Sequence, residues 1–110
     1  MNLFKRLFPN KNENSKSYKR DKAKSYDGKI LRYVTEMTEN GDVIIGKSGD
    51  ITVKEGKLIV CAGGKKLFEG VGEEITCGDL MSLDGVVITG FDDVENRERS
   101  IIAYFKYYRK

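Results

Sequence analysis

Short apolar runs separated by glycine-containing turns occupy the chain from Ile30 to its end. The runs are rich in Val, Ile, Thr and Tyr, and several alternate apolar with polar positions, which is typical of strands with one buried face. The turns, such as ENGD at 39–42, KSGD at 47–50 and LDGV at 83–86, place glycine where a positive φ is usually needed. The pattern predicts about eight short strands: ILRYVTEM, DVIIG, DITV, KLIVCA, KKLFEG, EEITCG, GVVITGF and SIIAYFKYY.

The turn chemistry favours an all-β fold, a small antiparallel β-barrel or roll formed by residues 28–110. Strand runs joined by a few residues that include glycine are typical of hairpins, whose strands are antiparallel. The last two runs, GVVITGF and SIIAYFKYY, are joined by the charged loop DDVENRER, which also fits a hairpin. The run KLIVCA is apolar on both faces, so we expect it to be a central strand.

The glycines also have a rhythm that fits a different fold. They recur every seven or eight residues, at positions 41, 49, 56, 63, 70, 78 and 85. Such a period is typical of a solenoid of short parallel rungs, and in rhythm it resembles the bactofilin type of polymerising β-helix. That resemblance implies a polymer-forming scaffold. The rungs share no repeated residue pattern, however, and the hairpin-like turns favour the antiparallel barrel or roll.

The segment before the β domain divides into two parts. Residues 1–8, MNLFKRLF, carry two Leu and two Phe on one side of a short helix and Lys and Arg on the other. Residues 9–27, PNKNENSKSYKRDKAKSYD, have almost no apolar side chains beyond Tyr18, Ala23 and Tyr26, too few to offset the entropy lost on ordering. We predict that residues 9–27 form a disordered basic linker between the amphipathic segment and the β domain.

Charge is divided unevenly between these parts. Residues 1–26 hold eight Lys or Arg against two carboxylates, a net charge of +6, whereas residues 27–110 hold twelve against fifteen, a net charge of −3. A basic tail on an acidic body predicts contact between the tail and polyanions such as phospholipid head groups or nucleic acid. No run approaches the roughly 20 apolar residues of a membrane-spanning helix, and the N-terminus lacks the continuous apolar stretch of a secretory signal. We therefore expect a cytoplasmic protein, peripheral at the inner membrane face where its tail meets lipid.

The chain contains no histidine. Because histidine is the commonest general base and metal ligand, its absence argues against an enzyme, and we expect no catalytic residues, cofactor or metal site. Cys61 and Cys77 are too few for a zinc site on their own and are expected to be buried, reduced thiols. Acidic clusters, such as Asp92 and Asp93 in FDD, are expected to solubilise turns, and AGGKK at 62–66 lacks the spacing of a phosphate-binding loop.

The end of the chain, AYFKYYRK, interleaves aromatic and basic residues. Proteins that bind single-stranded nucleic acid use such residues for base stacking and phosphate contact. A simpler interpretation is that one aromatic face packs in the core while the tyrosines of the other cover the flank of the barrel, with their hydroxyl groups in water. The net negative charge of the β domain also weakens the nucleic-acid hypothesis. The candidate nucleic-acid-binding residues are Tyr104, Lys106, Tyr108, Arg109 and Lys110.

These features favour a non-enzymatic binding or adaptor module whose basic amphipathic N-terminus associates weakly with an anionic membrane surface or with an unidentified protein partner. In outline the β domain resembles small bacterial β-barrel domains, including pleckstrin-like ones, but it lacks their C-terminal helix. Edge strands would also allow a homo-oligomer. The alternatives are a small-barrel nucleic-acid-binding protein and, more distantly, the bactofilin-like scaffold. The candidate membrane- or partner-binding residues are Leu3, Phe4, Lys5, Arg6, Leu7 and Phe8.

Overall fold

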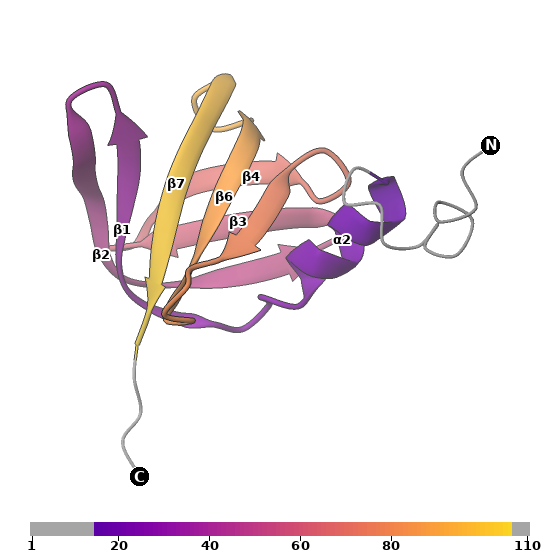
Figure 1. Ribbon diagram of the computed structural model, residues 1–110, viewed down its shortest axis with the longest axis horizontal. Helices are drawn as coiled ribbons and strands as arrows, with labels where there is room; N and C mark the ends of the chain where they lie inside the picture. Colours follow the sequence, from indigo (N-terminus) through magenta and orange to yellow (C-terminus); the bar gives the residue numbers. More distant parts are fainter. Residues whose placement is uncertain (1–14, 107–110) are drawn as a thin grey trace, which may run out of the picture.

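The fold is that of a computed structural model, which describes residues 15–106 (Figure 1). These residues form one helix, α2 (Lys16–Lys24), and seven strands. The strands belong to a single sheet with the order β4-β3-β2-β1-β7-β6-β5. They are β1 (Ile30–Thr38), β2 (Gly41–Lys54), β3 (Lys57–Ala62), β4 (Lys65–Val71), β5 (Thr76–Asp79), β6 (Gly85–Asp92) and β7 (Arg97–Phe105).

Every pairing in this sheet is antiparallel. The turns at 55–56 and 63–64 have positive φ at both central residues, the geometry of tight hairpins whose twist matches the flanking strands. The sheet curls so that β4 meets the end of β6, where the Asp93 amide donates to the Glu69 carbonyl (2.8 Å). The prediction of an all-β antiparallel barrel or roll is therefore confirmed. The solenoid of parallel rungs is wrong for the described residues, because these glycine turns reverse the chain.

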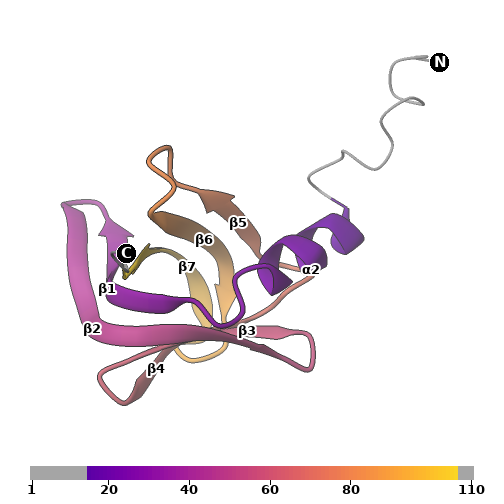
Figure 2. The ribbon, with the colours of Figure 1, turned by 90° about the horizontal axis from the view of Figure 1, so that it is seen from below.

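The predicted strands DVIIG and DITV form one long strand, β2, which is why there are seven strands rather than about eight. The sequence KSGD at 47–50, expected to be a turn, is instead a sharp corner inside β2 (Figure 2). Ser48 has a φ of 59°, and a Cβ on Gly49 would lie 1.8 Å from the Cys61 carbonyl oxygen, so only glycine fits there. β2 pairs with β1 on one side over 41–50, and from the corner onward it pairs with β3 on its other side, over 49–54.

The inner face of the curled sheet is the hydrophobic core. Residues on β3 alternate between buried and half-buried positions, so KLIVCA is apolar on both faces as expected but lies second from the edge strand β4. Each fully buried aliphatic side chain contributes about 1.5–3 kcal/mol relative to an exposed one. Outside α2, the apolar side chains that are at most 1% exposed are Leu31, Val34, Ile51, Leu58, Val60, Phe68, Ile75, Val86, Ile88, Ile101 and Ala103.

The segment predicted to be a disordered linker, residues 9–27, contains helix α2. The Ser15 side chain caps this helix by accepting the Tyr18 amide (3.1 Å). Ala23 is fully buried and Tyr26 is 4% exposed, and both belong to the same core as the strands. The prediction of disorder is wrong for the helix, because a few apolar side chains are enough to stabilise a helix when they pack into a core formed mainly by a sheet. The part of the segment before Ser15 lies outside the described residues.

A buried ion cluster holds β4 against the rest of the sheet. Arg99 of β7 has a side chain only 2% exposed, and it donates to Asp92 of β6 (2.7 Å) and twice to Glu36 of β1 (2.9 and 3.1 Å). Arg99 also donates to the Leu67 carbonyl of β4 (2.7 Å). Asp92 is fully buried and accepts the Glu69 amide of β4 (2.9 Å) as well as two amides of its own turn. The cluster therefore joins β1, β4, β6 and β7.

All three charged side chains of this cluster stay ionised. Burial opposes the charge of Asp92, but hydrogen bonds from the Glu69 amide, from Arg99 and from the turn amides outweigh it and lower the pKa. Hydrogen bonds from Arg99 hold the pKa of Glu36 below its usual range. Burial also opposes the charge of Arg99, yet its bonds to both carboxylates raise its pKa. The expectation that Asp92 solubilises a turn is wrong, because that turn folds back onto β4.

We expect the folded state to lose stability as the pH falls below the pKa of a free carboxyl group, about 4. Folding lowers the pKa of Glu36 and Asp92, so their contribution is present above the unfolded pKa and is lost as pH falls through the folded pKa. Asp92→Asn should remove part of this acid dependence and cost about 3 kcal/mol at neutral pH, because Arg99 loses a buried partner. Denaturant unfolding from neutral to strongly acidic pH measures both effects. Asp93→Asn is the matched exposed control, and equal profiles for the two variants would refute the assignment.

We also expect the two obvious N-terminal truncations to differ. A chain that starts at Ser15 should keep the unfolding free energy of the full chain, because every core residue named above follows that position. A chain that starts at Asp27 should lose about 3–5 kcal/mol or more, the cost of removing one large aromatic side chain from a core. Tyr26→Ala in the full chain should reproduce most of that loss in the same denaturant titration. Equal stability of both truncated chains would show that α2 contributes nothing to the core.

Candidate functional site

The structure describes only some of the residues predicted to bind a partner. Tyr104 and Lys106 lie at the end of β7 and just after it. The remaining predicted residues lie outside the described part of the chain, and their roles stay predictions. They are Tyr108, Arg109 and Lys110 near the C-terminus and Leu3, Phe4, Lys5, Arg6, Leu7 and Phe8 near the N-terminus.

Tyr104 belongs to an aromatic pair on the outer face of the sheet. It lies opposite Tyr33 of β1, with the ring centroids 4.6 Å apart. The Arg32 guanidinium lies over both rings, 5.5 and 6.0 Å from their centroids. Arg32 also pairs with Asp84 (3.5 Å) and donates to the Phe105 carbonyl (2.9 Å). The rings and the guanidinium therefore contact one another, an arrangement that covers part of each aromatic surface.

The environment of this pair favours a neutral Tyr104 hydroxyl. Partial burial raises the pKa of Tyr104, and the nearby Tyr33, Asp42 and Asp84 add to the effect. The sequence interpretation missed Tyr33 and Arg32, which lie about seventy residues from Tyr104 along the chain. The available signal was the tyrosine next to arginine in the run ILRYVTEM, which only the pairing of β1 with β7 connects to the C-terminal strand.

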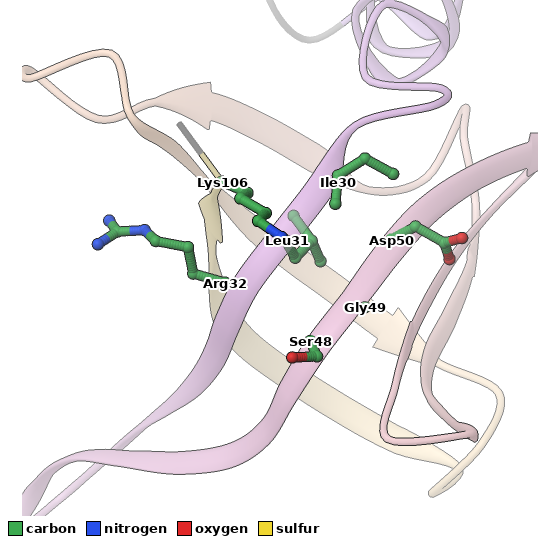
Figure 3. A pocket seen from close by; sticks show the side chains of 7 residues that line it. All are labelled: Ile30, Leu31, Arg32, Ser48, Gly49, Asp50 and Lys106. Carbon is green, nitrogen blue, oxygen red and sulfur yellow. The ribbon is translucent and has the colours of Figure 1, made fainter. Parts of the chain in front are cut away.

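A shallow groove lies beside the aromatic pair, over the part of β1 and β2 next to the corner of β2 (Figure 3). Arg32 and Asp50 extend to opposite sides in this view, and Lys106 lies between them, its amide donating to the Ile30 carbonyl (2.8 Å). The lining mixes two cations, one carboxylate and apolar carbon. Among the described residues, no nucleophile–base hydrogen bond is present in this groove. The residues that line it are Ile30, Leu31, Arg32, Ser48, Gly49, Asp50 and Lys106.

Helix α2 forms a basic end of the molecule, on the right in Figures 1 and 2. Residues 15–24 hold five Lys or Arg against one Asp, a net charge of +4. Lys22 pairs with Asp79 of β5 (3.2 Å), and Tyr26 donates to the same carboxylate (2.5 Å). Burial and the bond to Asp79 raise the pKa of Tyr26, while the bond from Tyr26 lowers that of Asp79. These contacts fix the helix beside β5, and Lys16 and Lys24 remain exposed on it.

The two cysteines differ in their surroundings. Cys77 is buried on β5, beside the groove between α2 and that strand. Burial raises the pKa of Cys77 to about 12, so it is a protonated thiol at neutral pH and a poor nucleophile. Cys61 on β3 is only half-buried, and both cysteines are free. The expectation of burial holds for Cys77 and is wrong for Cys61.

The hairpin of β1 and β2 projects from the other end of the molecule, away from α2 (Figures 1 and 2). We call its projecting part, residues 35–46, the β1–β2 arm. Met37, Val43 and Ile44 on this arm are 48%, 50% and 53% exposed. Large apolar side chains that gather on a projecting element are typical of interaction surfaces. The sequence interpretation assigned DVIIG to a strand but gave no reason to expect it at the surface.

Three further searches, for metal-ligand clusters, for membrane-spanning helices and for similar proteins, add no candidate site in the described residues. Among residues 15–106, no three His, Cys, Asp or Glu side chains lie together in a way that could hold a metal ion. The helical part of those residues is too short and too polar to cross a membrane. Comparison of the chain with protein-family models, with curated proteins and with solved structures finds no match.

Proposed function

We propose that this protein is a non-enzymatic binding module that is held at an anionic membrane surface by its basic N-terminal part and offers its β domain to a protein partner. The observation that carries the proposal is the position of α2. This helix gathers basic side chains at one end of the body, seven residues after the predicted amphipathic segment at 1–8. The exposed apolar side chains of the β1–β2 arm lie at the other end.

The amphipathic segment at 1–8 is expected to bind a membrane only weakly without the additional basic residues of α2. Burying two Phe and two Leu in a bilayer interface contributes about 1.5–3 kcal/mol per side chain. Ordering the backbone of seven residues costs roughly 1–2 kcal/mol per residue, so these two contributions nearly cancel. Each basic residue close to an anionic surface adds about 1 kcal/mol. The positive charges of 1–24 are therefore expected to decide whether the protein binds.

Helix α2 contributes its charge without a further entropic cost. Ala23 and Tyr26 hold it in the core, so its backbone is already ordered before any membrane contact. Lys16 and Lys24 are exposed and can meet head groups, while Lys22 is engaged by Asp79. A fixed basic helix also orients the body, because it directs the same end of the β domain toward the surface.

We expect the full chain to co-sediment with vesicles that contain phosphatidylserine, and this binding to weaken as salt is added. The chain that starts at Ser15 should lose most of the binding, because it lacks the amphipathic segment together with the three basic residues of 1–14. Lys16→Glu combined with Lys24→Glu should weaken it about thirtyfold, since two contributions of about 1 kcal/mol are lost. Lys65→Glu combined with Lys106→Glu is the control, with an equal change of charge away from α2. Pelleting of the full chain with neutral phosphatidylcholine vesicles that equals its pelleting with phosphatidylserine vesicles would refute electrostatic anchoring.

Binding of single-stranded nucleic acid is the second candidate function. The aromatic pair of Tyr33 and Tyr104, with Arg32 over it and Lys106 nearby, supports it, because stacking and phosphate contact use such groups. The mutual contact of the rings and Arg32, and the pairing of Arg32 with Asp84, favour the first proposal, because they leave less aromatic surface for a base.

We expect fluorescence anisotropy to separate the two candidates. A fluorescent oligothymidine should show at most weak association at low salt, and Tyr104→Ala should not change it, if the aromatic pair is structural. Saturable binding that falls steeply with salt and is lost in Tyr104→Ala would instead establish the second candidate. Tyr18→Ala, at a partly exposed tyrosine of α2, is the matched control for the loss of an aromatic ring.

A further inference from the structure

One edge of β2 is uncovered in the described part of the chain. β2 pairs with β1 over 41–50, but β3 reaches it only from Gly49 onward. The Ser48 carbonyl accepts the Gly63 amide (3.2 Å), so the turn between β3 and β4 ends the covered part. Over 41–47 no described strand pairs with the side of β2 that faces away from β1. Peptide groups on such an edge can pair with another strand.

The other two edges of the sheet have contacts with the rest of the fold. On β4, the Leu67 carbonyl accepts Arg99, the Glu69 amide donates to Asp92, and the Glu69 carbonyl accepts the Asp93 amide. On β5, helix α2 packs alongside and is fixed there by its contacts with Asp79. Folded proteins usually cover or blunt their sheet edges because an open edge promotes association. Among the described residues, the edge at 41–47 therefore has neither the hydrogen bonds of the β4 edge nor a helix beside it as on β5.

The side chains on this edge are arranged for pairing with an identical copy. The sequence from 42 to 47 is DVIIGK, with an acidic end, an apolar middle and a basic end. In antiparallel pairing of two copies, the acidic end of each lies against the basic end of the other. Parallel pairing would place like charges together. Val43 and Ile44 are each about half exposed; in this register Ile44 lies at the centre, near Ile44 of the other copy, and Val43 lies opposite Gly46.

The register within the arm allows both charge contacts. A bulge between Ile44 and Gly46 shifts the pairing with β1, so that Asp42 lies opposite Met37 and Lys47 lies opposite Tyr33. Alternate residues 33, 35 and 37 of β1 share the outer face, and their partners on β2 therefore share it too. Asp42 and Lys47 thus project from the same face. A two-fold axis perpendicular to the sheet keeps the outer faces of both copies on the same side, so the contact between Asp42 of one copy and Lys47 of the other forms twice.

We propose that two copies of this chain associate through the 41–47 edges of their β1–β2 arms, which joins their sheets in antiparallel register. This inference does not depend on membrane binding. A single strand pair buries less than the roughly 1,200–2,000 Å² of a stable specific interface, so the dimer is weak and depends on concentration. Its affinity is expected in the micromolar to millimolar range.

Sedimentation velocity of the full chain from micromolar to millimolar concentration tests association. Wild-type protein should shift from monomer toward dimer, and hydrogen exchange of the amides at 41–47 should slow as the concentration rises. Ile44→Lys should weaken association roughly tenfold or more, because it places like charges at the centre of the interface. Ile44 is exposed in the monomer, so circular dichroism should show an unchanged fold. A monomer at every concentration, or a dimer unaffected by Ile44→Lys, would overturn the proposal.

Reversal of single charges tests the register. Asp42→Lys alone gives each arm two cations, Lys47→Asp alone gives each arm two carboxylates, and both variants should associate less than wild type. An equimolar mixture of the two variants should regain association, because each contact then pairs opposite charges. The control pair is Glu98→Lys and Lys54→Asp, two exposed positions outside the edge, and mixing them should change nothing. Failure of the mixture to recover would exclude antiparallel self-pairing.

One further comparison identifies the occupant of the edge. If amides at 41–47 are protected in dilute full-length chain and lose that protection in the chain that starts at Ser15, the N-terminal segment of the same molecule covers the edge. That result would overturn pairing between copies. Protection that depends on concentration and is the same in both chains supports the proposed dimer.

Discussion

The buried guanidinium of Arg99 determines how the sheet closes. No backbone ladder joins β4 to β6, and beside the backbone bond from the Asp93 amide to the Glu69 carbonyl it is side-chain bonds that close the curl there. Arg99 and Asp92 supply them, with partners on β1, β4 and β7 and in the turn after β6. An ion pair buried in this way adds little stability compared with apolar packing, but the loss of one partner leaves an unpaired charge and costs about 3–5 kcal/mol. The cluster therefore specifies one closed geometry more than it adds to the total stability.

This closure also determines which edges stay open. Closing the half-barrel uses outward peptide groups of β4, and α2 docks beside β5. β2 pairs with both β1 and β3. It bends sharply at Ser48 and Gly49, and this bend curls the sheet around the core. The part of β2 before the corner then extends past β3. The open edge of the arm follows from the same curl that buries Arg99, and it leaves Val43 and Ile44 exposed.

The sequence predicted the local features of this fold better than the long-range ones. Alternation and glycine turns identified the strands and their antiparallel order, because both signals are carried by neighbouring residues. KSGD was assigned to a turn because a corner within a strand needs the same residue types as a turn. Glycine is required at position 49 because the Cys61 carbonyl of the neighbouring strand leaves no room for a Cβ, a contact that the sequence does not reveal. Asp92 looked like a solvated turn residue because its partner Arg99 becomes visible only when β6 and β7 pair. Helix α2 was missed because average composition does not reveal that Ala23 and Tyr26 meet a core built by other segments.

The separation of the basic end from the arm connects the two proposals. Because α2 and the arm lie at opposite ends of the body, an arm-to-arm dimer leaves both basic ends free at its far ends (Figures 1 and 2). When one end meets an anionic surface, the second is held near it at a high effective concentration, so two weak contacts act together. Membrane binding in turn concentrates copies in a plane and raises the dimer fraction. Each weak equilibrium would then strengthen the other. Two contacts that are each too small for strong binding would together hold the protein at the membrane.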